Sequence, residues 1–135
     1  MVKIVYVGFG IVSQGLAEII LKNNSVLPLA QNLETVGILD IMKGSKIDAN
    51  GIHMHEVLLN AKKGDYSLLT DTIIDIPKAI QEVDADIIIE ASFTDIKTGQ
   101  PAISHIVSAL KTDKHVVTTN KGPFAVGYKQ IFNLA

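Results

Sequence analysis

The chain has 135 residues, no cysteine, a hydrophobic fraction of 47% and a formal net charge of -2. This length fits one domain, the charge leaves no positive excess to neutralise a nucleic-acid backbone, and the lack of thiols excludes disulfides and thiolate sites. No secretion signal is visible and no apolar stretch reaches the ~20 residues of a membrane helix, so we expect a soluble, cytoplasmic protein with a small-molecule substrate and no nucleic-acid or membrane partner.

The chain begins with a strand, a glycine turn and a helix. Ile4–Val7 is a β-branched and aromatic run typical of a buried strand, and Gly8-Phe9-Gly10 leads into a helix expected over Ser13–Lys22. Gly8 allows a tight turn, Gly10 lets a pyrophosphate approach the backbone, and amide groups at the helix start face its negative charge. The pattern predicts a dinucleotide site, with a purely structural turn as the alternative.

Ser13 stands where the usual motif has a third glycine. Serine is small enough for close packing of helix against strand, and Gly15 adds a second small position. The helix is expected to stop at Asn23-Asn24-Ser25, a sequon that we interpret as part of a polar loop rather than as a glycosylation site. A loop then continues to Asn32.

The second strand is expected over Thr35–Asp40 and ends in an acid. An acid at this place commonly binds the adenine ribose and repels a 2′-phosphate, although Asp40 lies farther from Gly10 than the usual spacing of about 20 residues. The alternative is a solvated aspartate. Asp40 favours NAD over NADP, yet nearby lysines could supply charge for a 2′-phosphate: Lys43, Lys46, Lys62 or Lys63.

The middle of the chain is less strongly patterned. We expect a polar connection over Lys43–Asn50, a helix over Gly51–Lys63 and a short edge strand at Ser67–Leu69. Pro77 suits the first turn of a helix over Lys78–Val83, because proline lacks the N–H that is unsatisfied there.

Four histidines raise the question of a metal site. His53 and His55 are two apart on a predicted helix and point to different faces, while His105 and His115 have no companion at ligand spacing. We therefore expect no metal.

The second half continues the alternation of strand and helix. Asp86–Glu90 and His115–Thr118 are expected as strands, Gly99–Lys111 as an amphipathic helix, and a last helix starts near Phe124. Strands joined by helical crossovers are parallel. We predict an α/β fold, a Rossmann-like doubly wound parallel sheet of order close to 3-2-1-4-5, as a single domain over residues 1–135.

In such a sheet, ligands bind outside the carboxyl ends of the strands. Ala91 and Ser92 follow a strand next to the first one and are suited to border a nicotinamide ring, with Ser92 bonding its ribose or carboxamide. Glu90 could act as an acid or base, but a carboxylate at a strand end is more often bonded to neighbouring N–H groups.

The turn Thr118-Thr119-Asn120-Lys121-Gly122-Pro123 follows another strand end. Lys121 is expected to point at the same crevice as the glycine turn, where its ammonium could orient an anionic substrate or move a proton during hydride transfer. The alternative is a surface lysine in a turn.

The chain resembles the N-terminal nucleotide-binding domain of homoserine dehydrogenase over essentially all of its length. The strongest match is Glu90–Pro123, EASFTDIKTGQPAISHIVSALKTDKHVVTTNKGP, which is similar to the family segment that ends in an Asn-Lys-Gly-Pro turn. Gly8–Val12 and the connection Asp40–Gly51 agree with it, and Ser13 departs from the more common glycine.

The resemblance implies an oxidoreductase that interconverts homoserine and aspartate 4-semialdehyde with NAD or NADP, in the pathway to threonine and methionine. By analogy, Asp40 lies near the adenosine ribose, Ser92 at the nicotinamide side, and Lys121 at the junction of cofactor and substrate, as the candidate catalytic residue. The cofactor-binding candidates are Gly8, Phe9, Gly10, Ile11, Val12, Asp40, Ala91, Ser92, Thr119 and Lys121.

The family also implies a following domain with substrate-binding carboxylates, a second catalytic lysine, a cation site and most of a dimer interface. We therefore expect these 135 residues to be a truncated piece, cut within its last helix, that binds dinucleotide without full activity, and the full-length enzyme to be a homodimer. Two alternatives stay open: a related enzyme such as aspartate dehydrogenase, and a non-catalytic nucleotide-sensing module.

Overall fold

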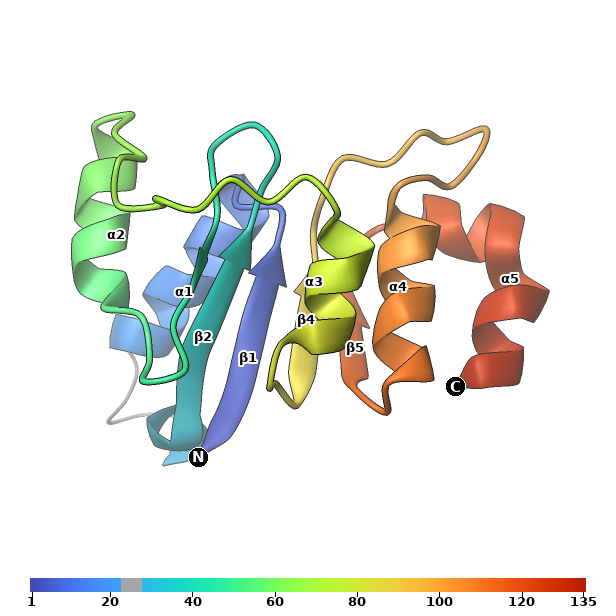
Figure 1. Ribbon diagram of the computed structural model, residues 1–135, viewed down its shortest axis with the longest axis horizontal. Coiled ribbons are helices and arrows are strands. Elements are labelled where there is room, and N and C mark those ends of the chain that lie inside the picture. Colours follow the sequence, from blue (N-terminus) through green and yellow to red (C-terminus); the bar gives the residue numbers. More distant parts are fainter. Residues whose placement is uncertain (23–27) are drawn as a thin grey trace.

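A five-stranded sheet with helices on both faces forms the centre of the computed structural model, which describes residues 1–22 and 28–135 (Figure 1). The sheet order is β3-β2-β1-β4-β5. The strands are β1 (Val2–Val7), β2 (Leu33–Leu39), β3 (Lys46–Ile47), β4 (Ile87–Glu90) and β5 (His115–Thr118). All neighbours pair in parallel except β2 and β3. The predicted α/β class and strand order are confirmed.

The edge of the sheet beside β2 differs from the prediction. Ser67–Leu69 begins in a turn and forms no strand, and the edge strand is instead β3, within the stretch expected as the polar connection Lys43–Asn50. β3 runs antiparallel because a short turn through Gly44, whose φ is 104°, returns the chain beside β2 without a helical crossover. A strand of two residues is too short for its side chains to show a hydrophobic period.

The α-helices follow the predicted order with shifted ends, and Pro28–Asn32, predicted as part of a loop, forms a 3-10 helix. The helices are α1 (Ile11–Lys22), the 3-10 helix η1 (Pro28–Asn32), α2 (Met54–Lys62), α3 (Ile76–Glu82), α4 (Ala102–Lys111) and α5 (Gly122–Leu134). α2 and α4 start three residues later than expected because Gly51 and Gly99 have φ of 94° and 71°, outside the helical region. The predicted helix end at 23–25 lies outside the described residues.

Pro77 lies in the first turn of α3, as predicted, but the helix begins at Ile76, two residues before the predicted start at Lys78. The Asp75 side chain caps the helix and accepts a hydrogen bond from the Lys78 backbone N–H at 3.1 Å.

The central strands of the sheet are buried on both faces, and their side chains alternate between two cores. Ile4 and Tyr6 of β1 pack with α1 and α2, while Val5 and Val7 pack with α3 and α4. Figure 1 shows the same arrangement, with α5 beside α4 at one end of the molecule. The central strands are thereby held from two sides, which fixes the positions of the turns at their carboxyl ends. Within the described ranges, no helix is both long and apolar enough to cross a bilayer.

Candidate functional site

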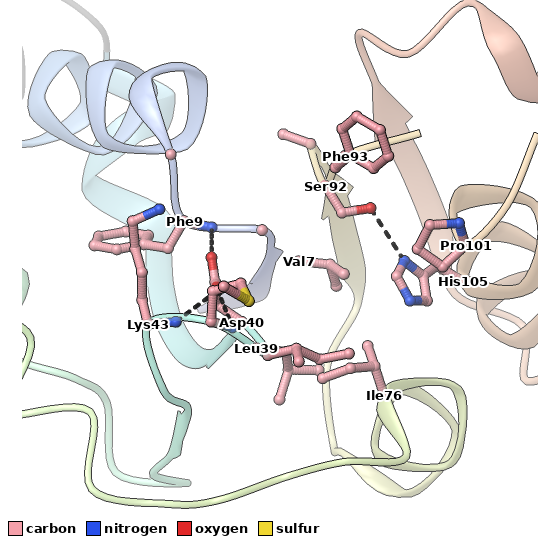
Figure 2. A pocket seen from close by; sticks show the side chains of 15 residues that line it. Val7, Phe9, Leu39, Asp40, Lys43, Ile76, Ser92, Phe93, Pro101 and His105 are labelled. Carbon is pink, nitrogen blue, oxygen red and sulfur yellow. Dashed lines mark hydrogen bonds between the residues drawn. The ribbon is translucent and has the colours of Figure 1, made fainter. Parts of the chain in front are cut away.

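A cleft of about 310 Å³ lies at the carboxyl ends of β1, β2 and β4 (Figure 2). Its walls come from the turns after these strands and from the starts of α3 and α4. The lining residues are Val7, Gly8, Phe9, Gly10, Leu39, Asp40, Ile41, Met42, Lys43, Ile76, Ala91, Ser92, Phe93, Pro101 and His105. Six of the predicted cofactor-binding residues meet there: Gly8, Phe9, Gly10, Asp40, Ala91 and Ser92.

Gly8 joins the turn after β1 to the loop after β4. Its φ is 81°, and a Cβ at this position would lie 2.6 Å from the Ser92 Cα and 2.7 Å from the Ala91 carbonyl oxygen. Only glycine permits this close approach. The predicted tight turn is confirmed, and the contact with the second loop is a further reason for glycine that the sequence did not indicate.

Gly10 is in the opposite situation. Apart from its neighbours in the chain, no atom of residues 1–22 and 28–135 lies within 4 Å of the position that its Cβ would take, and the residue lines the cleft. The backbone at Gly10 is therefore open to a ligand, which is the property that a pyrophosphate site requires.

Ser13 supports the turn from below. Its side chain is fully buried, as predicted for a small residue between helix and strand, and its Oγ donates a hydrogen bond to the Gly8 carbonyl at 2.6 Å. A serine here adds a bond that a third glycine could not make.

Phe9 contributes only its backbone to the cleft. Its ring is fully buried and meets Tyr6 edge-on, with 6.1 Å between ring centroids. Burial also raises the pKa of the Tyr6 hydroxyl to about 12, so this phenol stays neutral beneath the turn.

Asp40 connects the turns after β1 and β2. Its Oδ2 accepts from the Phe9 N–H at 2.8 Å, and its Oδ1 accepts from the Met42 and Lys43 N–H groups, both at 2.9 Å. Figure 2 shows this carboxylate beneath Phe9 at one side of the cleft. Asp40 is thus a bonded part of the rim, and its oxygens retain lone pairs for a further donor such as a ribose hydroxyl.

Ile11 and Val12, the remaining candidates of the glycine turn, begin α1. Both side chains are exposed, Ile11 to 92%. Amide groups in the first turn of a helix have no partner within the helix, so these two residues can offer N–H groups to an anion.

Glu90 lies at the end of β4, beneath the cleft, and is fully buried. Its Oε1 accepts from the Ser92 N–H at 2.8 Å, the Ser92 hydroxyl at 2.5 Å and the Asn120 side-chain amide at 3.0 Å. Its Oε2 is 2.6 Å from the His105 Nδ1. The expectation that a strand-end carboxylate binds neighbouring N–H groups is confirmed.

His105 is the site residue that the sequence did not reveal. It is buried on α4 and lines the cleft beside Ser92, whose Oγ is 3.4 Å from its Nδ1 (Figure 2). From the sequence, this histidine bears only on the question of a metal site. The available signal was a histidine within the apolar stripe of α4, since a buried imidazole needs a hydrogen-bonding partner.

Thr119 and Lys121 do not line the cleft, and both are exposed. Between them, Asn120 donates to the Ser92 carbonyl at 3.0 Å, so their turn is bonded to the cleft wall. Lys121 precedes the first turn of α5. Its role in catalysis remains a prediction.

Among residues 1–22 and 28–135, no three histidine, aspartate or glutamate side chains gather closely enough to hold a metal ion.

Comparison with known proteins decides the family. A family model described as "Homoserine dehydrogenase, NAD binding domain" matches residues 8–135. The chain belongs to this family.

Homoserine dehydrogenases from two organisms are similar to almost the whole chain. An NAD(+)-dependent homoserine dehydrogenase of Pseudomonas canavaninivorans is 38% identical over 138 residues, and a homoserine dehydrogenase of Methanocaldococcus jannaschii is 33% identical over 139. Each match covers 98% of this chain, but the chain spans only about 40% of the length of these relatives.

A solved structure of an Archaeoglobus fulgidus protein assigned as a homoserine dehydrogenase has the same fold. It matches with a TM-score of 0.80 at 31% identity, covering 100% of this chain and 39% of that one. The resemblance predicted from Glu90–Pro123 is confirmed. Since these relatives are homoserine dehydrogenases, they favour that family over the alternative of an aspartate dehydrogenase.

Proposed function

We propose that the cleft binds NAD or NADP as the cofactor site of a homoserine dehydrogenase. The observation that carries the proposal is the joining of three strand-end turns around one cleft: Asp40 bonds the Phe9 N–H, and Gly8 packs directly on Ser92. The open backbone at Gly10 fits a pyrophosphate. The adenosine half would then lie over β2 near Asp40, and the nicotinamide half over β4 near Ala91 and Ser92.

We infer that NAD is preferred to NADP. The Asp40 carboxylate is held at the rim by three backbone N–H groups, and its charge opposes a 2′-phosphate. The next two residues, Ile41 and Met42, are apolar and exposed. Lys43 lies with its Nζ 5.6 Å from the centroid of the Tyr66 ring. The name of the Pseudomonas canavaninivorans relative supports the same preference.

The reaction proposed for the whole protein is the interconversion of homoserine and aspartate 4-semialdehyde. The bound dinucleotide would supply or accept the hydride, and Lys121 is our candidate for orienting the substrate or moving the proton. We further propose that the whole protein is a homodimer and acts in the cytoplasm. These proposals rest on family membership, since the chain spans about 40% of its relatives.

Titration of the chain with NADH and NADPH tests the cofactor proposal. Gly10→Val should abolish binding of both, because the new side chain enters the open space where the pyrophosphate is expected. Gly15→Ala, at a helical glycine with equally open surroundings, is the matched control and should bind as the original chain does. Lys121→Ala should leave binding of the adenosine end largely intact. Failure of the original chain to bind either cofactor would refute the proposal.

A further inference from the structure

The most deeply buried charged group of the described chain lies directly beneath the cleft and belongs to a residue that does not line it. The carboxylate of Glu90 is fully buried and is met from four directions: by the Ser92 N–H, the Ser92 hydroxyl, the Asn120 amide and the His105 Nδ1. Burying a charge in this way is costly unless it is bonded on every side. The four hydrogen-bonding groups around Glu90 meet this condition.

The groups bonded to Glu90 come from three separate parts of the chain. Ser92 is in the loop after β4, His105 is on α4, and Asn120 is in the turn after β5. Asn120 also donates to the Ser92 carbonyl, which closes the network. One carboxylate thus fixes the positions of Ser92, of one wall of the cleft and of the turn that leads into Lys121.

The network also sets the hydrogen-bonding character of the Ser92 hydroxyl. A hydroxyl has one proton, and that of Ser92 is donated to Glu90 at 2.5 Å. Toward the cleft, the Ser92 Oγ can therefore only accept. The nicotinamide carboxamide carries an N–H donor that would suit this oxygen.

We propose that Glu90 and His105 are positioning residues for the nicotinamide end of the bound dinucleotide, acting through Ser92 and the Asn120–Lys121 turn. The inference rests on the proposed function and deepens it. Glu90 orients Ser92 as an acceptor, and His105 holds the second carboxylate oxygen. Asp40, near which the adenosine end is proposed to bind, follows β2, on the other side of β1 from this network.

Two ligands separate the ends of the cofactor. NADH has the nicotinamide, whereas ADP-ribose has the adenosine, the pyrophosphate and the second ribose without it. In calorimetric titrations of the chain, Glu90→Leu should raise the dissociation constant for NADH roughly tenfold, which corresponds to about 1.4 kcal/mol of lost hydrogen bonding. The dissociation constant for ADP-ribose should change less than about twofold. Loss of the fold would instead weaken both ligands together.

Glu90→Gln is the conservative variant. Its side-chain oxygen can still accept from Ser92 and Asn120, while its amide can donate to the His105 Nδ1 in the other tautomer. NADH affinity should therefore return to near the original value. Ser108→Ala removes another buried hydroxyl from α4, outside the network, and should leave both ligands unaffected.

Asn120→Ala is the alternative variant if Glu90→Leu fails to fold, because Asn120 is only half-buried. Its loss removes the hydrogen bonds to Glu90 and to the Ser92 carbonyl from the same network. Selective weakening of NADH in either variant, with recovery in Glu90→Gln, supports the inference. If the affinities for NADH and ADP-ribose change equally, or if neither changes, the inference is overturned while the proposed function stands. An original chain that binds neither ligand overturns both.

Discussion

Gly8 and Gly10 belong to one turn, yet different physical demands keep each a glycine. At Gly8 the demand is internal, because the backbone has a positive φ and touches Ser92. At Gly10 nothing in the described chain fills the space of a side chain, so the demand would come from the proposed ligand. Residues of the same motif can therefore be separated into folding and binding roles by experiment.

Gly8→Ala is expected to destabilise the chain by roughly 1–3 kcal/mol, because an L-residue at φ 81° is strained and its Cβ would overlap backbone atoms of the β4 loop. Urea unfolding measures the loss. The control is Gly15→Ala, which should be neutral or stabilising by up to about 1 kcal/mol within α1. Equal stability of the Gly8 variant and the original chain would contradict the contact seen at Ser92.

Asp40→Asn should lower the ratio of the NADPH to the NADH dissociation constant about tenfold, because it removes the negative charge that repels the 2′-phosphate. It should also cost roughly 1–3 kcal/mol of stability, since one of the two accepting carboxylate oxygens becomes an NH2 group, which cannot accept from the backbone N–H of Phe9 or from those of Met42 and Lys43. Parallel titrations and urea unfolding measure the two effects. An unchanged cofactor ratio would argue that Asp40 serves only to join the turns.

At the residue scale, the sequence predicted which positions meet in the cleft better than what each side chain does there. Gly8, Asp40 and Ser92 were found because strand ends in a parallel sheet converge. The burial of the Phe9 ring and the partnership of Glu90 with His105 were not, because each depends on helices packing against the sheet at a particular distance, α1 and α2 for Phe9 and α4 for Glu90. Sequence spacing does not contain that distance.

Glu18 joins the two helices that cover one face of the sheet. Its Oε1 is 2.8 Å from the Nζ of Lys22 on α1 and 2.8 Å from the Nζ of Lys62 on α2. Hydrogen bonds to these two ammonium groups lower the pKa of Glu18 from 4.5 to about 2. The ionised Glu18 carboxylate therefore stabilises the folded state.

Because this pKa is lower in the folded state, the stabilisation is complete above pH 4.5 and is lost as the pH falls to about 2. Glu18→Gln should lower the thermal midpoint at pH 7, and the difference from the original chain should vanish near pH 2. In 1 M salt, where the screening length is about 3 Å, the difference at pH 7 should shrink. A difference independent of pH would exclude the ion pairs as its cause.

Elements with several buried apolar residues were predicted correctly, whereas the two-residue strand β3 was not. β1, β4 and α4 each bury enough apolar residues for their type to be read from the sequence. β3 forms because it pairs with β2. An isolated antiparallel bridge between Ser45 and Asp71 adds a further backbone pairing next to β3. Pairing of this kind is tertiary and leaves little trace in local composition.

For the whole chain, we expect binding without turnover. The chain spans about 40% of its relatives and contains the proposed cofactor cleft. Homoserine oxidation by the purified 135-residue chain, followed through NADH absorbance, should therefore be negligible even at saturating NAD. Ordinary dehydrogenase rates would contradict this and assign the substrate site to the residues described here.

The central claim is that the turns after β1, β2 and β4 act as one dinucleotide site, and amide hydrogen exchange with and without NADH tests it most directly. We predict that saturating NADH protects residues 8–13, 40–43 and 91–93 together, with one shared affinity, and leaves the opposite edge of the sheet unchanged. Protection limited to one turn, or located at the amino ends of the strands, would contradict the account.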